Sequence, residues 1–185
     1  KNIIDPVLIK LALFTQHLSN INQSSLKTLL SNQEFLFQYV KDNTIDKKYI
    51  QRKFLNEEMY SYLIKNNDIP FDEIPDKIKT KELCEIAVRK NGIVLPYVPK
   101  RFITKELCIL ALKQNGLAID YVPDQYRKKD LLTLAVQQNA YALKKIKKSE
   151  VNDLDSDDEY IKLCNIAVQR KGLALEFVPE EYKTY

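Results

Sequence analysis

The chain has 185 residues, with 29 Lys and Arg against 25 Asp and Glu, 45% hydrophobic residues, three Gly, three Cys and one His. These values are typical of a globular protein and exclude a disordered or collagen-like chain. No apolar run approaches the about 20 residues of a membrane span, and no export signal is visible. One His and three separated Cys cannot form the usual zinc sites, so we expect no metal, no cofactor and a reducing, cytoplasmic environment.

A repeat of 24 residues organises the sequence. Residues 80–99 recur as residues 104–123, with Thr-Lys-Glu-Leu-Cys at the start, Asn-Gly in the middle and Tyr-Val-Pro at the end. All three Gly, all three Cys and four of the seven Pro occupy single positions of this repeat. A fixed period of this length predicts tandem structural units that stack on their neighbours.

In chain order, the repeat predicts one array of about seven units over residues 1–185. Residues 8–55 contain degenerate N-terminal units, and residues 56–147 contain regular units. Residues 148–158 carry an eight-residue insertion, and residues 159–185 form a C-terminal unit. The position that starts the apolar stripe of each unit is occupied by Leu11, Phe35, Met59, Leu83, Leu107, Leu131 and Leu163.

Each unit is predicted to begin with a helix of about three turns. Thr80 and Thr104 are expected to cap this helix, because a threonine hydroxyl accepts a hydrogen bond from a free first-turn amide. The apolar residues that follow Thr80 have α-helical spacing. They are Leu83, Cys84, Ala87 and Val88.

A short second helix is predicted over residues 93–98. Gly92 precedes it, and we expect this glycine to end the first helix in a left-handed conformation. Pro99 follows, and proline disfavours helical geometry in the residue before it. Two such short helices cannot bury their apolar faces alone, so the sequence predicts an all-α fold, an α-solenoid of stacked helical hairpins.

The three cysteines occupy one position of the repeat. Because Cys84, Cys108 and Cys164 stand beside recurring core residues, we expect them to be buried, reduced and unlinked.

The pattern Leu-Cys-x-x-Ala, Asn-Gly and Tyr-Val-Pro in residues 80–123 and 160–179 resembles a short tandem helical repeat family of unknown function. That family occurs in bacterial proteins, including those of intracellular pathogens, and in proteins of large DNA viruses. The resemblance covers about residues 56–185 and implies an all-helical array with no established activity. Ala140 and Lys147 depart from the pattern.

Basic residues are concentrated in the middle of the chain. Residues 76–148 contain 16 Lys and Arg against 7 Asp and Glu, a net charge of +9. Such a surface is suited to a phosphate backbone or an acidic protein. The alternative is a solvated lysine-rich surface, which we favour because Tyr97 and Tyr121 are expected in the core rather than on a platform for stacking bases.

Long polar side chains recur at two neighbouring positions near the end of each first helix. Such a ridge follows one side of an array and is a candidate partner-binding surface, although any exposed helix face has a similar composition. The candidate residues are Lys65, Arg89, Lys90, Lys113, Gln114, Gln137, Gln138, Gln169 and Arg170.

The sequence contains no recognisable catalytic motif. There is no glycine-rich phosphate loop, no nucleophile elbow and no metal-spaced ligand set. The acidic stretch from Asp153 to Glu159 fails as a calcium loop, because Asp158 stands where that loop needs glycine and Cys164 where it needs glutamate. We therefore expect no catalytic residues.

These observations favour a non-enzymatic protein-interaction scaffold over the alternative, a nucleic-acid-binding helical array that uses the basic surface of residues 76–148. We expect a protein partner and no membrane span. The scaffold is compatible with part of a larger bacterial effector or multidomain protein, and a secreted effector would act in the host cytoplasm.

The ends of the sequence carry a further expectation. Thr184 occupies the same repeat position as Thr80 and Thr104, so the sequence stops where another unit would begin. We expect a fragment of a longer protein, with exposed apolar faces around Phe177, Val178 and Tyr182 that promote self-association.

Overall fold

The computed structural model describes residues 33–41, 52, 55–151 and 158–183, and in these ranges every regular element is a helix and none is a strand. The predicted all-α class is confirmed. Leu11, most of residues 8–55, six residues of the insertion and Thr184 lie outside the described residues. No helix in the described ranges has the length and apolar character that crossing a membrane requires.

The chain divides into two bodies, an N-terminal body of residues 1–70 and a C-terminal body of residues 71–185. The N-terminal body contains α3 (Gln33–Lys41) and α4 (Glu57–Asn66). The rings of Phe37 and Tyr62 join the two helices edge to face, with centroids 6.1 Å apart. Asn56 caps α4 by accepting a hydrogen bond from the Met59 amide at 3.0 Å. A single array over the whole chain stays a prediction.

The C-terminal body begins with a short 3₁₀ helix, η3 (Phe71–Glu73), and then repeats one sequence of elements four times. Each repeat unit has an α-helix, a 3₁₀ helix of six residues and a 3₁₀ turn of three residues. The α5 unit contains α5 (Lys81–Lys90), η4 (Gly92–Tyr97) and η5 (Lys100–Phe102). The α6 unit contains α6 (Lys105–Gln114), η6 (Gly116–Tyr121) and η7 (Asp124–Tyr126).

The last two units follow the same order. The α7 unit contains α7 (Lys129–Gln138), η8 (Ala140–Lys145) and η9 (Lys148–Glu150). The α8 unit contains α8 (Asp158–Arg170), η10 (Gly172–Phe177) and η11 (Glu180–Tyr182). Because Lys148–Glu150 corresponds to Lys100–Phe102 of the α5 unit, the regular pattern continues to Val151, beyond residue 147.

Local sequence explains where these helices begin and end. The hydroxyls of Thr80 and Thr104 accept hydrogen bonds from the Leu83 and Leu107 amides, each at 3.2 Å, so both predicted caps are confirmed. Val98 is extended at φ −79° and ψ 129°, as expected before proline. The predicted short second helix is a 3₁₀ helix, and the turn after the proline was not predicted.

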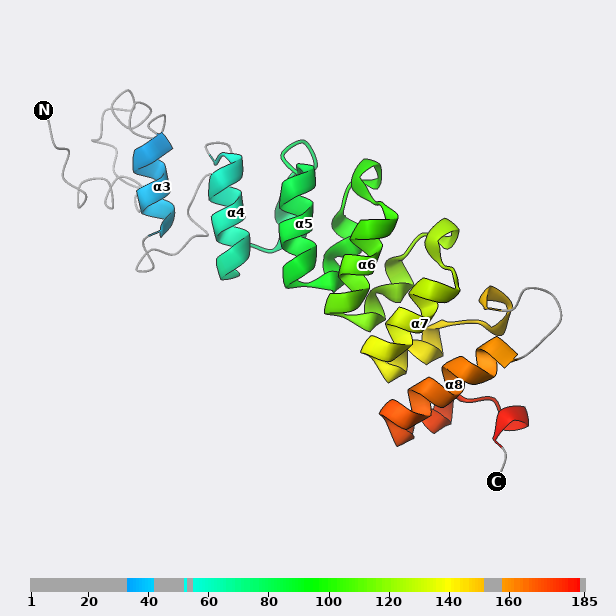
Figure 1. Cartoon of the computed structure of the whole chain (residues 1–185). Coiled ribbons are helices and arrows are strands. Elements are labelled where there is room, and N and C mark those ends of the chain that lie inside the picture. Colours follow the sequence, from blue (N-terminus) through cyan, green and yellow to red (C-terminus); the bar gives the residue numbers. More distant parts are fainter. Residues whose placement is uncertain (1–32, 42–51, 53–54, 152–157, 184–185) are drawn as a thin grey trace, which may run out of the picture. The chain divides into compact units, whose positions relative to one another are not determined.

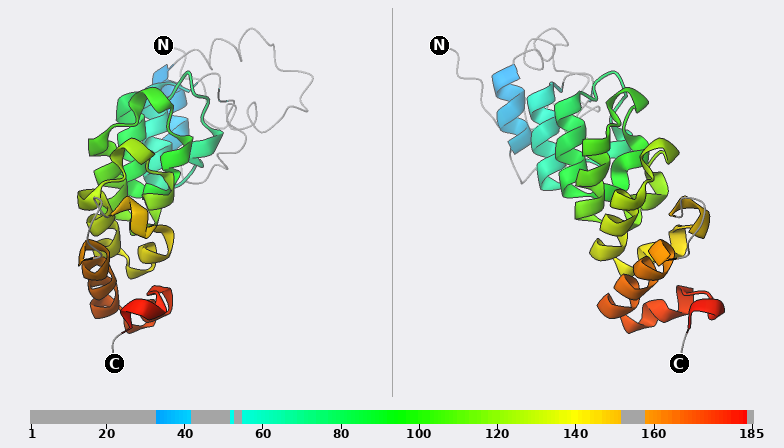
Figure 2. Two further views of the ribbon diagram at one scale, coloured as in Figure 1. Left: turned by 90° about the vertical axis from the view of Figure 1, so that its right-hand side faces the viewer. Right: turned by 45° about the vertical axis from the view of Figure 1, so that its right-hand side comes forward.

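Successive units pack in two layers (Figures 1 and 2). Each α-helix from α5 to α7 contacts the next one, and η4, η6 and η8 each contact the α-helix and the six-residue 3₁₀ helix of the next unit. The predicted stripe residues form the core between these layers, with exposed fractions of 0–2% for Leu83, Cys84, Ala87 and Val88. Each of the α5, α6 and α7 units is therefore covered by the unit that follows it.

The predicted left-handed role of glycine is wrong. No described glycine has a positive φ, and the only described residue that does is Asn67, at φ 62°. Gly92 is required because a Cβ there would overlap the carbonyl oxygen of Ala111, and Gly116 stands in the same relation to Ala135. The glycines permit close approach of the next helix rather than a turn of the chain.

Candidate functional site

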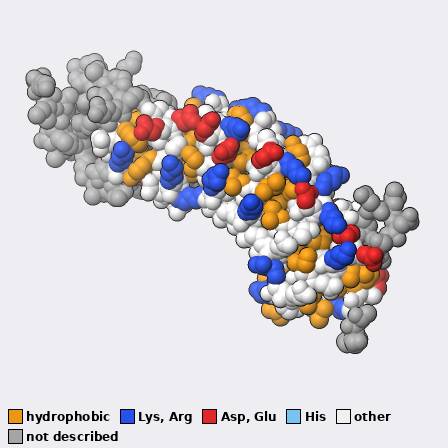
Figure 3. Space-filling model, viewed as in Figure 1, with side chains coloured by type: hydrophobic (Ala, Val, Ile, Leu, Met, Phe, Trp, Pro, Cys, Tyr) orange, Lys and Arg blue, Asp and Glu red, His pale blue; other side chains and the backbone are white. Residues whose placement is uncertain are grey.

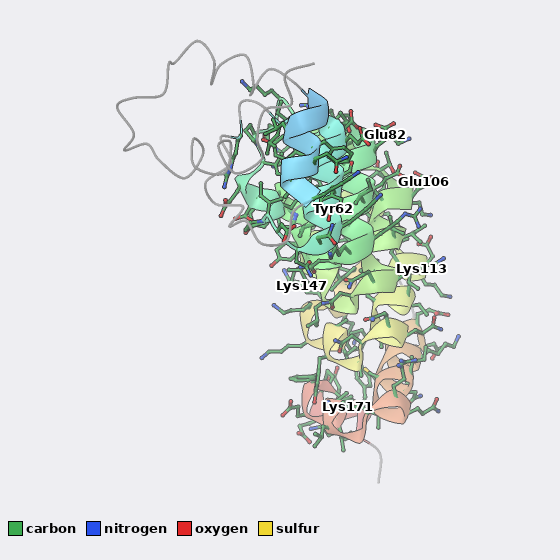
Figure 4. All side chains as sticks on the ribbon, turned by 90° about the vertical axis from the view of Figure 1, so that its left-hand side faces the viewer. Tyr62, Glu82, Glu106, Lys113, Lys147 and Lys171 are labelled. Atoms are coloured by element: carbon green, nitrogen blue, oxygen red, sulfur yellow. The ribbon has the colours of Figure 1, made fainter. Side chains whose placement is uncertain are left out.

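The residues at one of the two candidate repeat positions form an exposed row along the C-terminal body. Arg89, Lys113, Gln137 and Gln169 lie on α5, α6, α7 and α8, and all four are exposed. Figure 4 shows Glu106 and Lys113, at the two ends of α6, projecting on one side of the ribbon, with Lys147 on the opposite side. Arg89 and Lys113 form no ion pair within the described residues. Lys65 is also exposed, on α4 of the N-terminal body.

A groove of about 330 Å³ lies between α5 and α6, next to this row. Lys81, Glu85 and Arg89 are spaced four residues apart, so they share one face of α5 and form a charged wall. Phe102 and two leucines of α6 supply apolar surface. The lining residues are Lys81, Glu85, Arg89, Phe102, Thr104, Glu106, Leu107 and Leu110. Space filling shows charged side chains of both signs with hydrophobic ones between them over α5 to α7 (Figure 3).

Charges around the groove are fixed by the local structure. The Glu106 pKa is lowered by hydrogen bonds from its own backbone amide and from Thr104, and further by nearby Lys105 and Lys81, so its carboxylate is ionised at neutral pH. The Arg101 guanidinium lies 4.6 Å from the centre of the Phe102 ring and donates to the Asp76 carbonyl at 3.1 Å. These contacts hold Phe102 in place at the groove.

The equivalent position between α6 and α7 is bridged. Lys105 and Asp130 occupy the repeat positions of Lys81 and Glu106, and they form an ion pair of 2.6 Å. The hydrogen bond from Lys105 lowers the Asp130 pKa. No described ion pair joins Lys81 to Glu106, so the groove between α5 and α6 lacks the bridge that Lys105 and Asp130 form at the equivalent place.

The groove was not predicted, although the sequence contains a signal for it. Ile86, Leu110, Leu134 and Ile166 recur at one position just outside the core stripe, and all four are half-buried. This partial exposure is what an apolar groove beside a packed core requires.

Two predicted partner-binding residues, Gln114 and Gln138, make hydrogen bonds within the fold. The Gln114 side chain accepts from the Gly92 amide at 2.6 Å and donates to the Lys90 carbonyl at 3.1 Å. Gln138 accepts from the Gly116 amide and donates to the Gln114 carbonyl at 3.2 Å. Each glutamine therefore connects its own helix to the end of the preceding helix. The side-chain amide group of each glutamine is engaged by these hydrogen bonds.

Lys90 and Arg170 occupy the same repeat position as Gln114 and Gln138 but do not make the glutamine contacts. Lys90 is half-buried, and its carbonyl receives the hydrogen bond from Gln114. Arg170 is exposed at the end of α8. Within the C-terminal body, the candidate residues that are exposed and make no such contact are the four of the exposed row and Arg170.

Several members of the predicted basic surface are occupied by contacts within the fold. Lys79 is only 5% exposed, and it donates to Asp76 at 2.9 Å and to the Tyr97 carbonyl at 2.8 Å. Arg127 donates to the Ile119 and Lys145 carbonyls and pairs with Glu150 at 2.7 Å. Further pairs between units are Lys105 with Asp130, Lys129 with Glu159 and Lys145 with Asp120, each at 2.6 Å.

The expectation that Tyr97 and Tyr121 lie in the core is wrong. Tyr97 is 49% exposed and Tyr121 is 41% exposed. Both close a six-residue 3₁₀ helix at equivalent places in successive units. The sequence-based argument against stacking of bases therefore no longer holds.

The expected exposed apolar face of the last unit involves different residues. Val178 is buried, and Phe177 and Tyr182 are half-buried, with Phe177 edge to face against Tyr141 at 5.8 Å. The exposed side chains are Leu173 at 69% and Leu175 at 46%.

The described residues contain no group of three or more His, Cys, Asp or Glu side chains that could hold a metal ion. Cys84, Cys108 and Cys164 are buried and unlinked, as predicted. Burial raises the pKa of each thiol to about 11. These thiols pack in the core, and the raised pKa keeps them protonated at neutral pH.

Residues 104–150 match the family described as Domain of unknown function (DUF4116). The matched segment begins at the Thr104 cap and ends at Glu150 in η9, so it covers the α6 and α7 units. The chain is similar to this family over about a quarter of its length. No curated protein and no solved structure matches the chain.

Proposed function

We propose that the repeat units form an α-solenoid that acts as a non-enzymatic protein-interaction scaffold. The groove between α5 and α6 is the proposed contact site, and the exposed row from Arg89 to Gln169 extends it. Repeat arrays bind partners through extended surfaces of this kind, which are built from equivalent positions of successive units.

The open groove is the observation that carries this proposal. Its apolar residues, Phe102 and Leu110, offer a place for one hydrophobic side chain of a partner. Arg89 at the same groove has no carboxylate partner among the described residues, and a guanidinium binds carboxylates with two parallel hydrogen bonds. The proposed partner is a protein segment in which an apolar residue is followed closely by an acidic one.

Site-specific photo-crosslinking tests this proposal. A photoreactive phenylalanine analogue at Glu85 would lie at the groove, and the same analogue at Gln125, an exposed residue of η7, is the matched control. We expect a protein to be crosslinked from position 85 and not from position 125, and Arg89→Glu to abolish that product. Equal products from both positions, or a product that Arg89→Glu leaves unchanged, would contradict the groove as the contact site.

The exposed tyrosines support nucleic-acid binding as a second candidate function. Tyr97 and Tyr121 recur 24 residues apart, and aromatic side chains at regular intervals offer stacking surfaces for successive bases. Against this, ion pairs between units occupy Lys105, Arg127 and Lys145 of the basic surface. Single-stranded RNA binding that falls steeply between low and moderate salt, and that Tyr97→Ala with Tyr121→Ala removes, would favour this function over the scaffold.

A further inference from the structure

The outer face of the last repeat unit lacks the cover that the same face has in every earlier unit of the C-terminal body. Leu95, Ile119 and Leu143 occupy one position of the repeat, and their exposed fractions are 0%, 0% and 1%. Leu175 occupies this position in η10 and is 46% exposed. The fold of the α8 unit therefore presents an apolar surface that its equivalents bury.

The earlier units show what covers this face. The α6 backbone packs against Gly92 at the Ala111 carbonyl, and the approach is so close that no Cβ fits between them. The Gly116 backbone receives α7 at Ala135 in the same way. Gly172 is the third glycine at this position, and a Cβ there would meet nothing within 4 Å.

A side-chain contact accompanies each glycine. Gln114 follows Ala111 by three residues and bonds to the Gly92 amide, and Gln138 follows Ala135 by three residues and bonds to the Gly116 amide. The helix that covers a glycine therefore carries Ala and Gln three residues apart.

This glutamine is absent where the glycine is absent. In the α7 unit Ala140 replaces the glycine, and the helix that follows, α8, carries Arg170 in place of the glutamine. A glycine in one unit is thus paired with a glutamine in the next unit at Gly92 and at Gly116. Where Ala140 replaces the glycine, the glutamine of the next unit is also replaced. Gly172 keeps the first half of this pair.

From these relationships, we propose that the face formed by Gly172, Leu173 and Leu175 docks an amphipathic helix with Ala and Gln three residues apart near its C-terminal end. The Ala backbone lies against Gly172, and the Gln side chain accepts from the Gly172 amide. Leu173 and Leu175 pack against the apolar side of the helix. This surface is separate from the groove between α5 and α6, so the proposal is independent of the proposed function.

The described helices of a second copy do not fit this role. Within the described residues, α6 and α7 are the helices that carry Ala and Gln at this spacing, and their Ala backbones and Gln side chains are already packed against Gly92 and Gly116. No helix within the described ranges presents this pair freely, and the proposed occupant is a helix of a partner protein that does.

Lys183 lies at the edge of the same unit and offers a polar contact there. Lys79 and Lys183 occupy one position of the repeat, and each pairs with an acidic residue three places earlier, at 2.9 Å and 2.6 Å. Lys79 also reaches the Tyr97 carbonyl in the unit that follows it. We expect Lys183 to donate to a backbone carbonyl that follows the docked helix.

The test uses a synthetic helix as the probe. A fluorescent peptide with the sequence of residues 128–139 contains Ala135 and Gln138, and a lactam bridge between positions 133 and 137 holds it helical on the side away from the contact. We expect saturable binding to the whole chain by fluorescence anisotropy. Chemical-shift changes should centre on the Leu173 and Leu175 methyl groups.

Two variants locate the contact. Gly172→Ala should weaken binding by about tenfold or more, because its Cβ occupies the place of the peptide carbonyl, although this variant has open space and should fold normally. Gln138→Ala in the peptide should weaken binding about threefold to tenfold through the lost hydrogen bond.

Three results would overturn the proposal. They are the absence of binding at millimolar peptide, equal binding to Gly172→Ala, and a dimer of the free chain in sedimentation that Gly172→Ala abolishes. The last result would assign the face to a second copy.

Discussion

The Gln114 side chain bonds to the Gly92 amide at 2.6 Å and to the Lys90 carbonyl at 3.1 Å, and it thereby joins the end of α5 to the end of α6. Both contacts need the α6 backbone to approach Gly92 closely, which the absence of a Cβ permits. The glycine and the glutamine are therefore two parts of one contact between repeat units.

Gly92→Ala is expected to destabilise the protein. The new Cβ would overlap the Ala111 carbonyl oxygen, and because both partners are backbone atoms, α6 must move. Overpacking of this kind costs about 1–3 kcal/mol, which a urea titration would detect as a lower midpoint.

Gly172→Ala is the matched control, because the same substitution there meets no atom within 4 Å. Its φ is not positive, so alanine is tolerated, and a reduced unfolded-state entropy should leave the stability unchanged or raise it by up to about 1 kcal/mol. An equal loss of stability in the two variants would contradict the close-approach explanation.

Gln138→Ala should lower the free energy of unfolding by about 1–2 kcal/mol. The substitution removes one hydrogen bond to the Gly116 amide and one to the Gln114 carbonyl, each worth about 0.5–1.5 kcal/mol. Gln137→Ala, one residue earlier, changes an exposed side chain with no hydrogen-bond partner among the described residues, so it should stay within about 0.5 kcal/mol of the parent protein. Chemical denaturation of both variants checks the difference, and identical midpoints would argue against a structural role for Gln138.

The repeat register could be predicted from sequence because local chemistry repeats with it. A threonine cap needs only its own helix, and the stripe from Leu83 to Val88 has a spacing that indicates one buried face. Both predictions depend on contacts within one unit or on burial alone, and both are confirmed.

The errors concern contacts between units. The roles of Gly92 and Gln114 depend on the hydrogen bond between them. The repeat period shows that each residue recurs, but it does not show which residue each one contacts. Tyr97 recurs beside buried residues such as Val98, yet it lies on the exposed side of a 3₁₀ helix, and the sequence pattern did not predict the 3₁₀ geometry of this element. Sequence spacing therefore identified the row of Arg89 and Lys113 but could not separate it from the structural glutamines.

Arg127→Met is expected to be strongly destabilising. Its guanidinium donates to two carbonyls and pairs with Glu150, with side-chain exposures of 10% for Arg127 and 23% for Glu150. Removal of one member leaves a largely buried carboxylate without its partner, which costs about 3–5 kcal/mol for a fully buried pair and somewhat less here.

A second substitution separates charge from packing in this cluster. Glu150→Gln added to Arg127→Met removes the unpaired charge and should recover part of the lost stability. Lys128→Met, at an exposed neighbour that makes no side-chain cap bond, is the control and should be near neutral. If thermal denaturation shows Arg127→Met and Lys128→Met to be equivalent, the Arg127 contacts do not stabilise the fold.

The buried thiols should make the protein resistant to alkylation at neutral pH. With the pKa raised to about 11 from the ordinary value of 9.0, the folded protein at pH 8 contains about a hundredfold less thiolate than an exposed cysteine. Iodoacetamide should therefore label Cys84, Cys108 and Cys164 slowly in buffer and quickly in denaturing urea, which mass spectrometry would resolve for each residue.

The same pKa shift predicts how stability depends on pH in the alkaline range. Below about pH 9 the thiols are protonated in both states, so their contribution to stability is complete. Between about pH 9 and pH 11 the unfolded chain loses thiol protons that the folded protein keeps, so unfolding becomes more favourable by up to about 1.4 kcal/mol per thiol for each pH unit. The variant Cys108→Ala, measured against the parent protein by urea titration, should show a shallower decline across this range. A decline of the same slope in both proteins, or rapid labelling of all three cysteines in native buffer, would show that the thiols are not buried as described.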